Sequence, residues 1–251
     1  MTLPPKKKSK RGKWILISVF IALFVMIIAG IGTVYIIKHD NKDISLVGVK
    51  SDKYQALFLT NGVEVYAQII DNRTTKTIAV HIDKNNERTI TVAGDLRPSG
   101  KDTSLPWEKL AEMDAVYFVS GDIQALEYSR RSRVLTSTAR IKPLLNISDL
   151  QLDALLTSEK DSGERYKPGD INPVPKFVIT TQGARGGYLD DGTRYEAEII
   201  PSENIVDFYG CGDSFAAGVT YGLVDGNIHD ALAVGIKAGA VAAQRRGAFG
   251  N

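Results

Sequence analysis

The chain has 251 residues, of which 43% are hydrophobic and 24% are charged, a composition typical of a folded domain with an appendage. Residues 1–13 contain six basic residues and no acid, so the rest of the chain holds 25 basic and 29 acidic residues. This acidic body argues against a nucleic-acid-binding domain. The single cysteine, Cys211, excludes an intrachain disulfide, and the three histidines lack a zinc-ligand spacing.

The stretch 14–37, WILISVFIALFVMIIAGIGTVYII, contains no charged residue. As a helix it would be about 36 Å long, enough to cross a hydrocarbon core of about 30 Å. A cleaved signal peptide is the alternative, but its apolar part normally spans about 7–15 residues. We therefore expect a single-pass transmembrane helix, with the basic tail 1–13 placing the N-terminus in the cytoplasm.

A linker with a β-hairpin is expected over residues 38–71. Asn61-Gly62 separates two β-prone runs, Tyr54–Thr60 and Val63–Ile70. An Asn-Gly pair favours the type I′ turn, because both central residues of that turn need a positive φ.

Residues 72–251 are expected to fold as an α/β domain. Thr77–Asp83 and Arg88–Ala93 predict another hairpin. Buried strands are expected in DAVYFVSGD, VLTSTAR, DALLTSEKD and KFVITTQG, a helix in ALEYSRRSR, and a hairpin in GGYLDDGTRYEAEII. Strands separated by helices predict a mainly parallel sheet with helices on both faces, and ligands of such sheets bind at the carboxyl ends of the strands.

Two helices are expected to close the chain. The first should follow Asp213, and the second should start at Asn227, which is a favourable N-cap residue. The second helix, ALAVGIKAGAVAAQ, consists mostly of small residues, which permit close packing against a neighbouring helix or a flat ligand.

The sequence YGCGDSFAAG at 209–218 places a carboxylate between two glycines and a helix. A glycine-rich turn that leads into a helix presents free backbone N–H groups and the positive end of the helix dipole, which attract anions and above all phosphate. A carboxylate beside such an anion hole can take the proton of an attacking hydroxyl during phosphoryl transfer. The alternative is an ordinary turn with an acid near a helix start, which the dipole stabilises by about 0.3–1 kcal/mol.

The sequence VDFYGCGDSFAAGVTYGLVDG resembles the signature of the ribokinase-like (PfkB) carbohydrate kinases. KFVITTQGARGGYL is similar to the nucleotide loop of that family, AGAVAAQRRGA to its late helix beside the adenine, and TKTIAVHIDKNNERTITVAG to its mid-chain hairpin. The resemblance covers about residues 72–251 and implies a partial ribokinase-like kinase domain that uses ATP, Mg²⁺ and, in some members, K⁺.

The resemblance implies a role for each matching residue. Asp213 corresponds to the catalytic base, and the turn Gly210, Cys211 and Gly212 to the anion hole. The nucleotide would be bound by Thr181, Gly183, Gly186, Ser158, Asp161 and Gly239. Asp207 corresponds to an acid that helps to bind a monovalent cation. Ser158 and Asp161 stand where the family has an N-x-x-E motif that organises magnesium, so Asp161 is also a candidate metal ligand.

The front of the chain differs from the family. The family's early Asp and its Gly-Gly-x-x-x-Asn stretch, which grip the sugar, have no counterpart before residue 72. Two hypotheses follow. The first is an ATP-dependent kinase that acts on a sugar or a related small hydroxyl compound. The second is a membrane-anchored, catalytically inactive remnant that acts as a binding or scaffold module.

Overall fold

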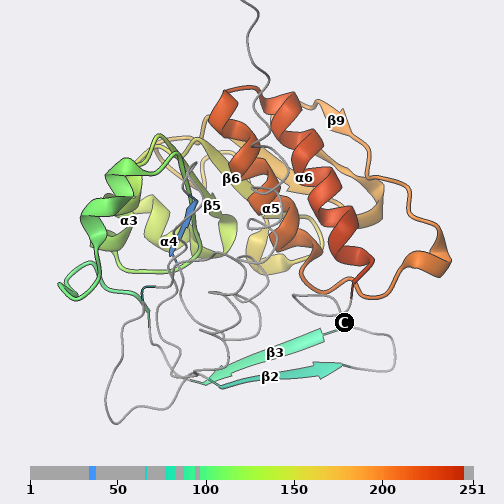
Figure 1. Cartoon of the computed structure of the whole chain (residues 1–251), viewed down its shortest axis with the longest axis horizontal. Coiled ribbons are helices and arrows are strands. Elements are labelled where there is room, and N and C mark those ends of the chain that lie inside the picture. Colours follow the sequence, from blue (N-terminus) through green and yellow to red (C-terminus); the bar gives the residue numbers. More distant parts are fainter. Residues whose placement is uncertain (1–33, 38–65, 67–76, 83–87, 94–96, 246–251) are drawn as a thin grey trace, which may run out of the picture.

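The computed structural model describes residues 34–37, 66, 77–82, 88–93 and 97–245. Within these residues the chain forms a seven-stranded sheet of order β1-β4-β5-β6-β7-β8-β9 and a separate two-stranded sheet, β2-β3 (Figure 1). The main sheet consists of β1 (Val34–Ile37), β4 (Ala115–Phe118), β5 (Val134–Thr138), β6 (Ala154–Ser158), β7 (Phe177–Thr181), β8 (Gly187–Leu189) and β9 (Arg194–Tyr195). The helices are α3 (Ile123–Arg130), α4 (Lys142–Asn146), α5 (Cys211–Gly222) and α6 (Ile228–Ala243).

The centre of the sheet is parallel, as the alternation of strands and helices predicted. Strands β4, β5, β6 and β7 pair in parallel in sequence order, while β1 and the β8-β9 hairpin add antiparallel strands at the two sides. Because the four central strands run the same way, the turns that follow them lie along one edge of the sheet. We call this edge the carboxyl edge.

Helices cover both faces of the sheet. Alternate strand residues such as Ala115, Leu156 and Ile179 pack against α5 and α6. Their neighbours, such as Val116, Leu155 and Val178, form a second apolar cluster with α3 and the segment that includes Trp107. The period-2 alternation of side chains in the strands therefore divides the core into two layers, one on each side of the sheet.

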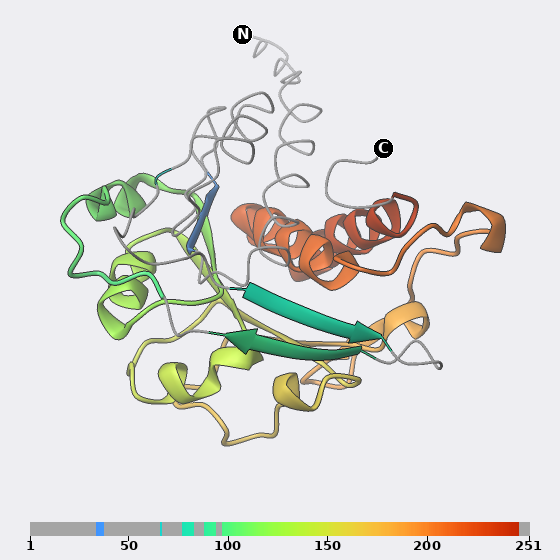
Figure 2. The same cartoon turned by 90° about the horizontal axis from the view of Figure 1, so that it is seen from below.

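The β2 (Thr77–Ile82) and β3 (Arg88–Ala93) strands form the predicted hairpin, with Thr77 opposite Ala93. In Figure 1 the hairpin lies below the main sheet, and in Figure 2, seen from below, it crosses in front of the sheet. It lies on the side of the domain where α6 ends (Figure 1).

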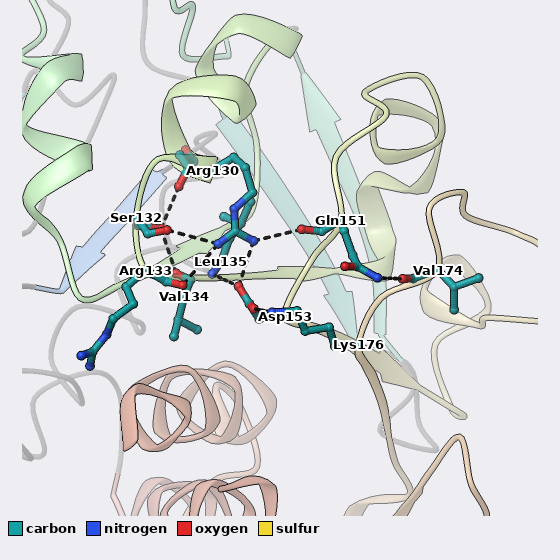
Figure 3. Close-up of polar contacts among 10 residues, drawn as sticks. Arg130, Ser132, Arg133, Val134, Leu135, Gln151, Asp153, Val174 and Lys176 are labelled. Atoms are coloured by element: carbon teal, nitrogen blue, oxygen red, sulfur yellow. Dashed lines mark hydrogen bonds and ion pairs between the residues drawn. The ribbon is translucent and has the colours of Figure 1, made fainter. Parts of the chain in front are cut away.

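The opposite edge of the sheet is fixed by Asp153, which lies just before β6 (Figure 3). Its Oδ2 accepts hydrogen bonds from the Leu135 N–H at 2.7 Å and from the Arg130 guanidinium at 2.8 Å. Its Oδ1 accepts one from Lys176 at 2.7 Å. These contacts join the end of α3 and the starts of β5, β6 and β7, so one carboxylate holds the amino ends of three strands together.

One predicted boundary is wrong. Val34–Ile37 was assigned to the end of the membrane helix, but it forms strand β1 and pairs antiparallel with β4. The β-branched valine and isoleucines favour this strand, which covers the open side of β4. Residues 14–33 and the hairpin predicted at 54–70, apart from Tyr66, lie outside the described residues. Among the residues that are described, no helix has the length and apolarity needed to cross a membrane.

Candidate active site

The first turn of α5 is built on Gly210. This residue is the N-cap and has φ 84° and ψ −2°, a left-handed conformation that glycine adopts without the strain of a side chain. The helix begins at Cys211, three residues earlier than predicted, so Asp213 lies inside its first turn instead of preceding it. An acid at this position interacts favourably with the positive end of the helix dipole.

The same turn leaves two backbone donors free. Ser214 N–H donates to the Gly210 carbonyl at 2.9 Å, but the amides of Gly212 and Asp213 have no acceptor within the described part of the chain. Gly212 is exposed, and a Cβ built on it would meet no atom within 4 Å. The turn therefore presents free N–H groups to an open space, as an anion hole requires.

Asp213 is a carboxylate in surroundings that disfavour its charge. Burial raises its pKa from 3.8 to about 7, the negative charge of Glu164 adds to the increase, and the positive charge of Arg140 opposes it. A carboxyl group with a pKa near neutrality can both hold and release a proton at physiological pH, which suits a general base.

A charged cluster faces Asp213 from the turns after β5 and β6. The Arg140 guanidinium lies 2.6 Å from Glu164 Oε1 and 3.0 Å from Asp161 Oδ2. Glu164 also accepts a long hydrogen bond, 3.4 Å, from the Thr138 hydroxyl at the end of β5. Burial raises the pKa of Glu164, although Arg140 opposes this effect.

The phenol of Tyr117, on β4, belongs to the same surroundings. Burial, assisted by the charges of Asp213 and Glu164, raises the pKa of Tyr117 well above its ordinary value. The phenol therefore stays neutral at physiological pH.

The predicted nucleotide loop follows β7. Gly183 and Gly186 have φ of 66° and 77°, and Gly186 N–H donates to the Gly183 carbonyl at 3.0 Å. A Cβ on Gly186 would lie 2.0 Å from the Tyr195 carbonyl oxygen, so only glycine fits there. Thr181, the last residue of β7, donates its hydroxyl to the Thr157 carbonyl at 3.1 Å. The loop is thus a tight backbone turn, and the hydroxyl of Thr181 that precedes it is hydrogen-bonded within the sheet.

Polar side chains fix this loop to its neighbours. Glu159 Oε2 accepts hydrogen bonds from Gln182 Nε2 and from the Arg185 guanidinium, each at 2.8 Å. Arg194, on β9, donates to Gln182 Oε1 at 2.8 Å. The turn after β6 therefore holds the turn after β7 in place.

The structure brings most of the predicted site residues to this edge. Ser158 pairs across the sheet with Thr181, and its hydroxyl accepts the Asp161 N–H at 3.3 Å. Gly239, on α6, faces the start of α5, where a Cβ on it would lie 3.2 Å from the Cys211 carbonyl oxygen. Cys211 is partly buried, and its Sγ donates to the Asp207 carbonyl across 3.8 Å.

The two predicted metal ligands have separate environments. Asp161 Oδ1 accepts the Gly163 N–H at 2.8 Å, and Asp207 Oδ1 accepts the Tyr209 N–H at 2.9 Å. The described residues contain no group of three or more metal-ligating side chains. Asp161 and Glu164 offer carboxylate oxygens, the ligand type that Mg²⁺ prefers, and both form ion pairs with Arg140.

Two residues of this cluster, Arg140 and Glu164, were not predicted. Arg140 lies 24 residues before Glu164, and the parallel pairing of β5 with β6 brings the two turns together. The sequence contains one signal that could have identified Glu164. Asp161-x-x-Glu164 has the spacing of an N-x-x-E motif and lies three positions after the pair Ser158 and Asp161, to which that motif was matched.

Among the comparisons with known proteins, the match to a family model lies in the C-terminal half of the chain. Residues 144–250 match the model of the pfkB family carbohydrate kinases. No curated protein sequence matches the chain.

Solved structures share the fold over most of the chain. The adenosine kinase from Schistosoma mansoni, in complex with 2-fluoroadenosine, has a TM-score of 0.63 and 14% identity, covering 93% of this chain and 79% of that one. The ribokinase from Thermotoga maritima has a TM-score of 0.63 and 16% identity, covering 93% and 81%. The nucleoside kinase from Burkholderia thailandensis, in complex with inosine, has a TM-score of 0.63 and 16% identity, covering 93% and 79%. At these identities the likeness shows a shared ribokinase-like fold.

Proposed function

We propose that the chain transfers the terminal phosphoryl group of ATP to a hydroxyl group of a sugar or nucleoside. The observation that carries this proposal is the first turn of α5, where Asp213 stands beside free amides and an open space. The pfkB match over residues 144–250 and the sugar and nucleoside kinases among the structural neighbours support the substrate class.

In this reaction Asp213 takes the proton of the acceptor hydroxyl. The hydroxyl oxygen forms a bond to the γ-phosphorus, the bond from that phosphorus to the β-phosphate oxygen breaks, and ADP leaves. The amides of Gly212 and Asp213 stabilise the negative charge on the transferred group. Magnesium, carried by the nucleotide near Asp161 and Glu164, would neutralise phosphate charge. The involvement of K⁺ at Asp207 stays a prediction.

The decisive experiment compares phosphoryl transfer from ATP by the full-length chain and by Asp213→Asn, over a panel of sugars and nucleosides. The amide keeps the shape of the side chain but cannot accept the proton. We expect the rate to fall by about 10²–10⁴-fold, the usual contribution of general-base catalysis, while ATP affinity stays close to that of the wild type.

Asp230→Asn is the matched control, because Asp230 is an exposed acid in the first turn of the neighbouring helix α6. It should keep full activity. An Asp213→Asn chain that retains more than about a tenth of the wild-type rate would contradict the base assignment. A wild-type chain that binds ATP but phosphorylates nothing would instead match a binding module without turnover.

A further inference from the structure

The turn after β6 contains three consecutive charged residues, Glu159, Lys160 and Asp161. The two acids are engaged, Glu159 by Gln182 and Arg185, and Asp161 by Arg140. Lys160 differs, because its ammonium group pairs with no carboxylate in the part of the chain that is described. It is an exposed cation at the carboxyl edge whose charge the surrounding structure leaves available.

Lys160 lies against the glycine loop that follows β7. A Cβ built on Gly183 would be 3.1 Å from Lys160 Nζ and 3.5 Å from its Cε, so the ammonium group stands directly over the backbone of that loop. Gly183 is also exposed. The cation and the loop therefore border the same open space.

The order of the strands places Lys160 between the glycine loop and the cluster around Asp213. Arg140 follows β5, Lys160 follows β6 and Gly183 follows β7, and these three strands are neighbours in the sheet. A nucleotide that contacts the glycine loop and delivers its terminal phosphate to the cluster around Asp213 must cross the turn after β6. Neighbouring strands are about 4.8 Å apart, so the crossing has the scale of a phosphate chain.

We propose that Lys160 binds the phosphate chain of the nucleotide, an inference that rests on the function proposed above. The primary amine donates up to three hydrogen bonds and matches phosphate oxygens as a compact positive charge. Glu159 assists by its bonds to Gln182 and Arg185, because these hold the loop beneath the ammonium group.

The test measures the equilibrium affinity of the full-length chain for ATP, ADP and adenosine, without any turnover. Lys160→Met removes the charge and keeps most of the apolar stem. We expect it to weaken ATP and ADP binding by at least about tenfold, a typical loss for a hydrogen bond to a charged group, and to leave adenosine binding unchanged. Lys160→Arg should restore most of the affinity. Lys167→Met, at an exposed lysine of the following loop, should match the wild type.

Each outcome decides a different point. Unchanged ATP affinity in Lys160→Met overturns the inference and leaves the proposed function standing. An equal loss for ATP and adenosine also overturns it, because the lysine would then act on the shape of the loop and not on phosphate. A wild-type chain without ATP affinity contradicts both proposals. A chain that binds ATP through Lys160 but transfers no phosphate contradicts only the catalytic proposal.

Discussion

Asp213 combines two opposing influences at the level of a single residue. The start of α5 favours its negative charge, whereas burial and the nearby Glu164 disfavour it, and the balance is a pKa of about 7. A base of this kind is only partly ionised at neutral pH, so the reaction rate should change with its protonation state.

The rate should therefore depend on pH in a definite direction. Only the ionised form of Asp213 can take a proton, so kcat/KM should fall about tenfold per pH unit below about pH 7 and level off above it. Glu164→Gln removes a charge that raises the pKa of Asp213, so it should move this acidic limb to lower pH. Steady-state rates between pH 5 and 9 measure both. A flat profile from pH 5.5 to 8 would exclude titration of the base.

At the level of secondary structure, the packing of α5 against α6 positions the candidate base, Asp213. A Cβ on Gly218 would lie 2.7 Å from the Gly235 Cα, and a Cβ on Gly222 would lie 2.5 Å from the Ala231 Cα. The hydroxyl of Thr220 meets that of Thr136 on β5 at 2.5 Å, which fixes α5 against the sheet. The glycines let the two helices approach closely, and the threonine pair ties α5 to β5.

Two glycine-to-alanine changes in α5 should affect different properties, stability in one case and activity in the other. Gly218→Ala should lower the free energy of unfolding by about 1–3 kcal/mol, because the methyl group overpacks the contact with α6. Gly212→Ala meets open space and should leave stability unchanged or slightly higher, but its methyl group would occupy the anion space. Loss of an anion-hole contact should then reduce phosphoryl transfer by about 10²–10³-fold. Chemical denaturation and rate assays on both variants separate the two roles, and a fully active Gly212→Ala chain would argue against phosphate binding there.

The elements that the sequence predicted well are those defined by local pattern. Four apolar runs form β4 to β7, and the hairpin expected in GGYLDDGTRYEAEII forms β8 and β9. The predicted start of α5 differs from the observed one because Gly210 caps the helix through its left-handed backbone. No capping side chain marks this start in the sequence. Arg140 and Glu164 were missed because their contact depends on strand pairing between distant segments.

At the scale of the whole molecule, the carboxyl edge of the sheet carries the candidate site and the opposite edge carries contacts that stabilise the fold. The candidate site is built from turns on the carboxyl edge, whereas Asp153 holds the amino ends of the strands through Arg130, Leu135 and Lys176 (Figure 3). Burial would raise the pKa of Asp153, but its hydrogen bonds hold the pKa below the ordinary value. Its stabilising effect is therefore present at neutral pH and is lost as the pH falls through that lowered pKa.

Asp153→Ala should destabilise the fold at pH 7 by about 1–3 kcal/mol, because the Leu135 N–H is left buried without its partner. Asp170→Ala, which removes a more exposed ion pair with Lys142, is the control and should have a smaller effect on stability than Asp153→Ala. Denaturant unfolding gives both values. ATP affinity, measured well below the unfolding temperature, should be the same in both variants. A selective loss of ATP affinity in Asp153→Ala would show that the two edges are coupled.

This division of tasks has an evolutionary consequence. Substitutions in the turns of the carboxyl edge can abolish or alter chemistry while the opposite edge keeps the strands in register, so an active enzyme and a silent descendant would share the same backbone. Selection on the two edges is then separable: a lineage that no longer needs catalysis would drift at Asp213 and Lys160 long before it drifts at Asp153. Which of these positions vary among descendants of this chain would record whether catalysis was kept.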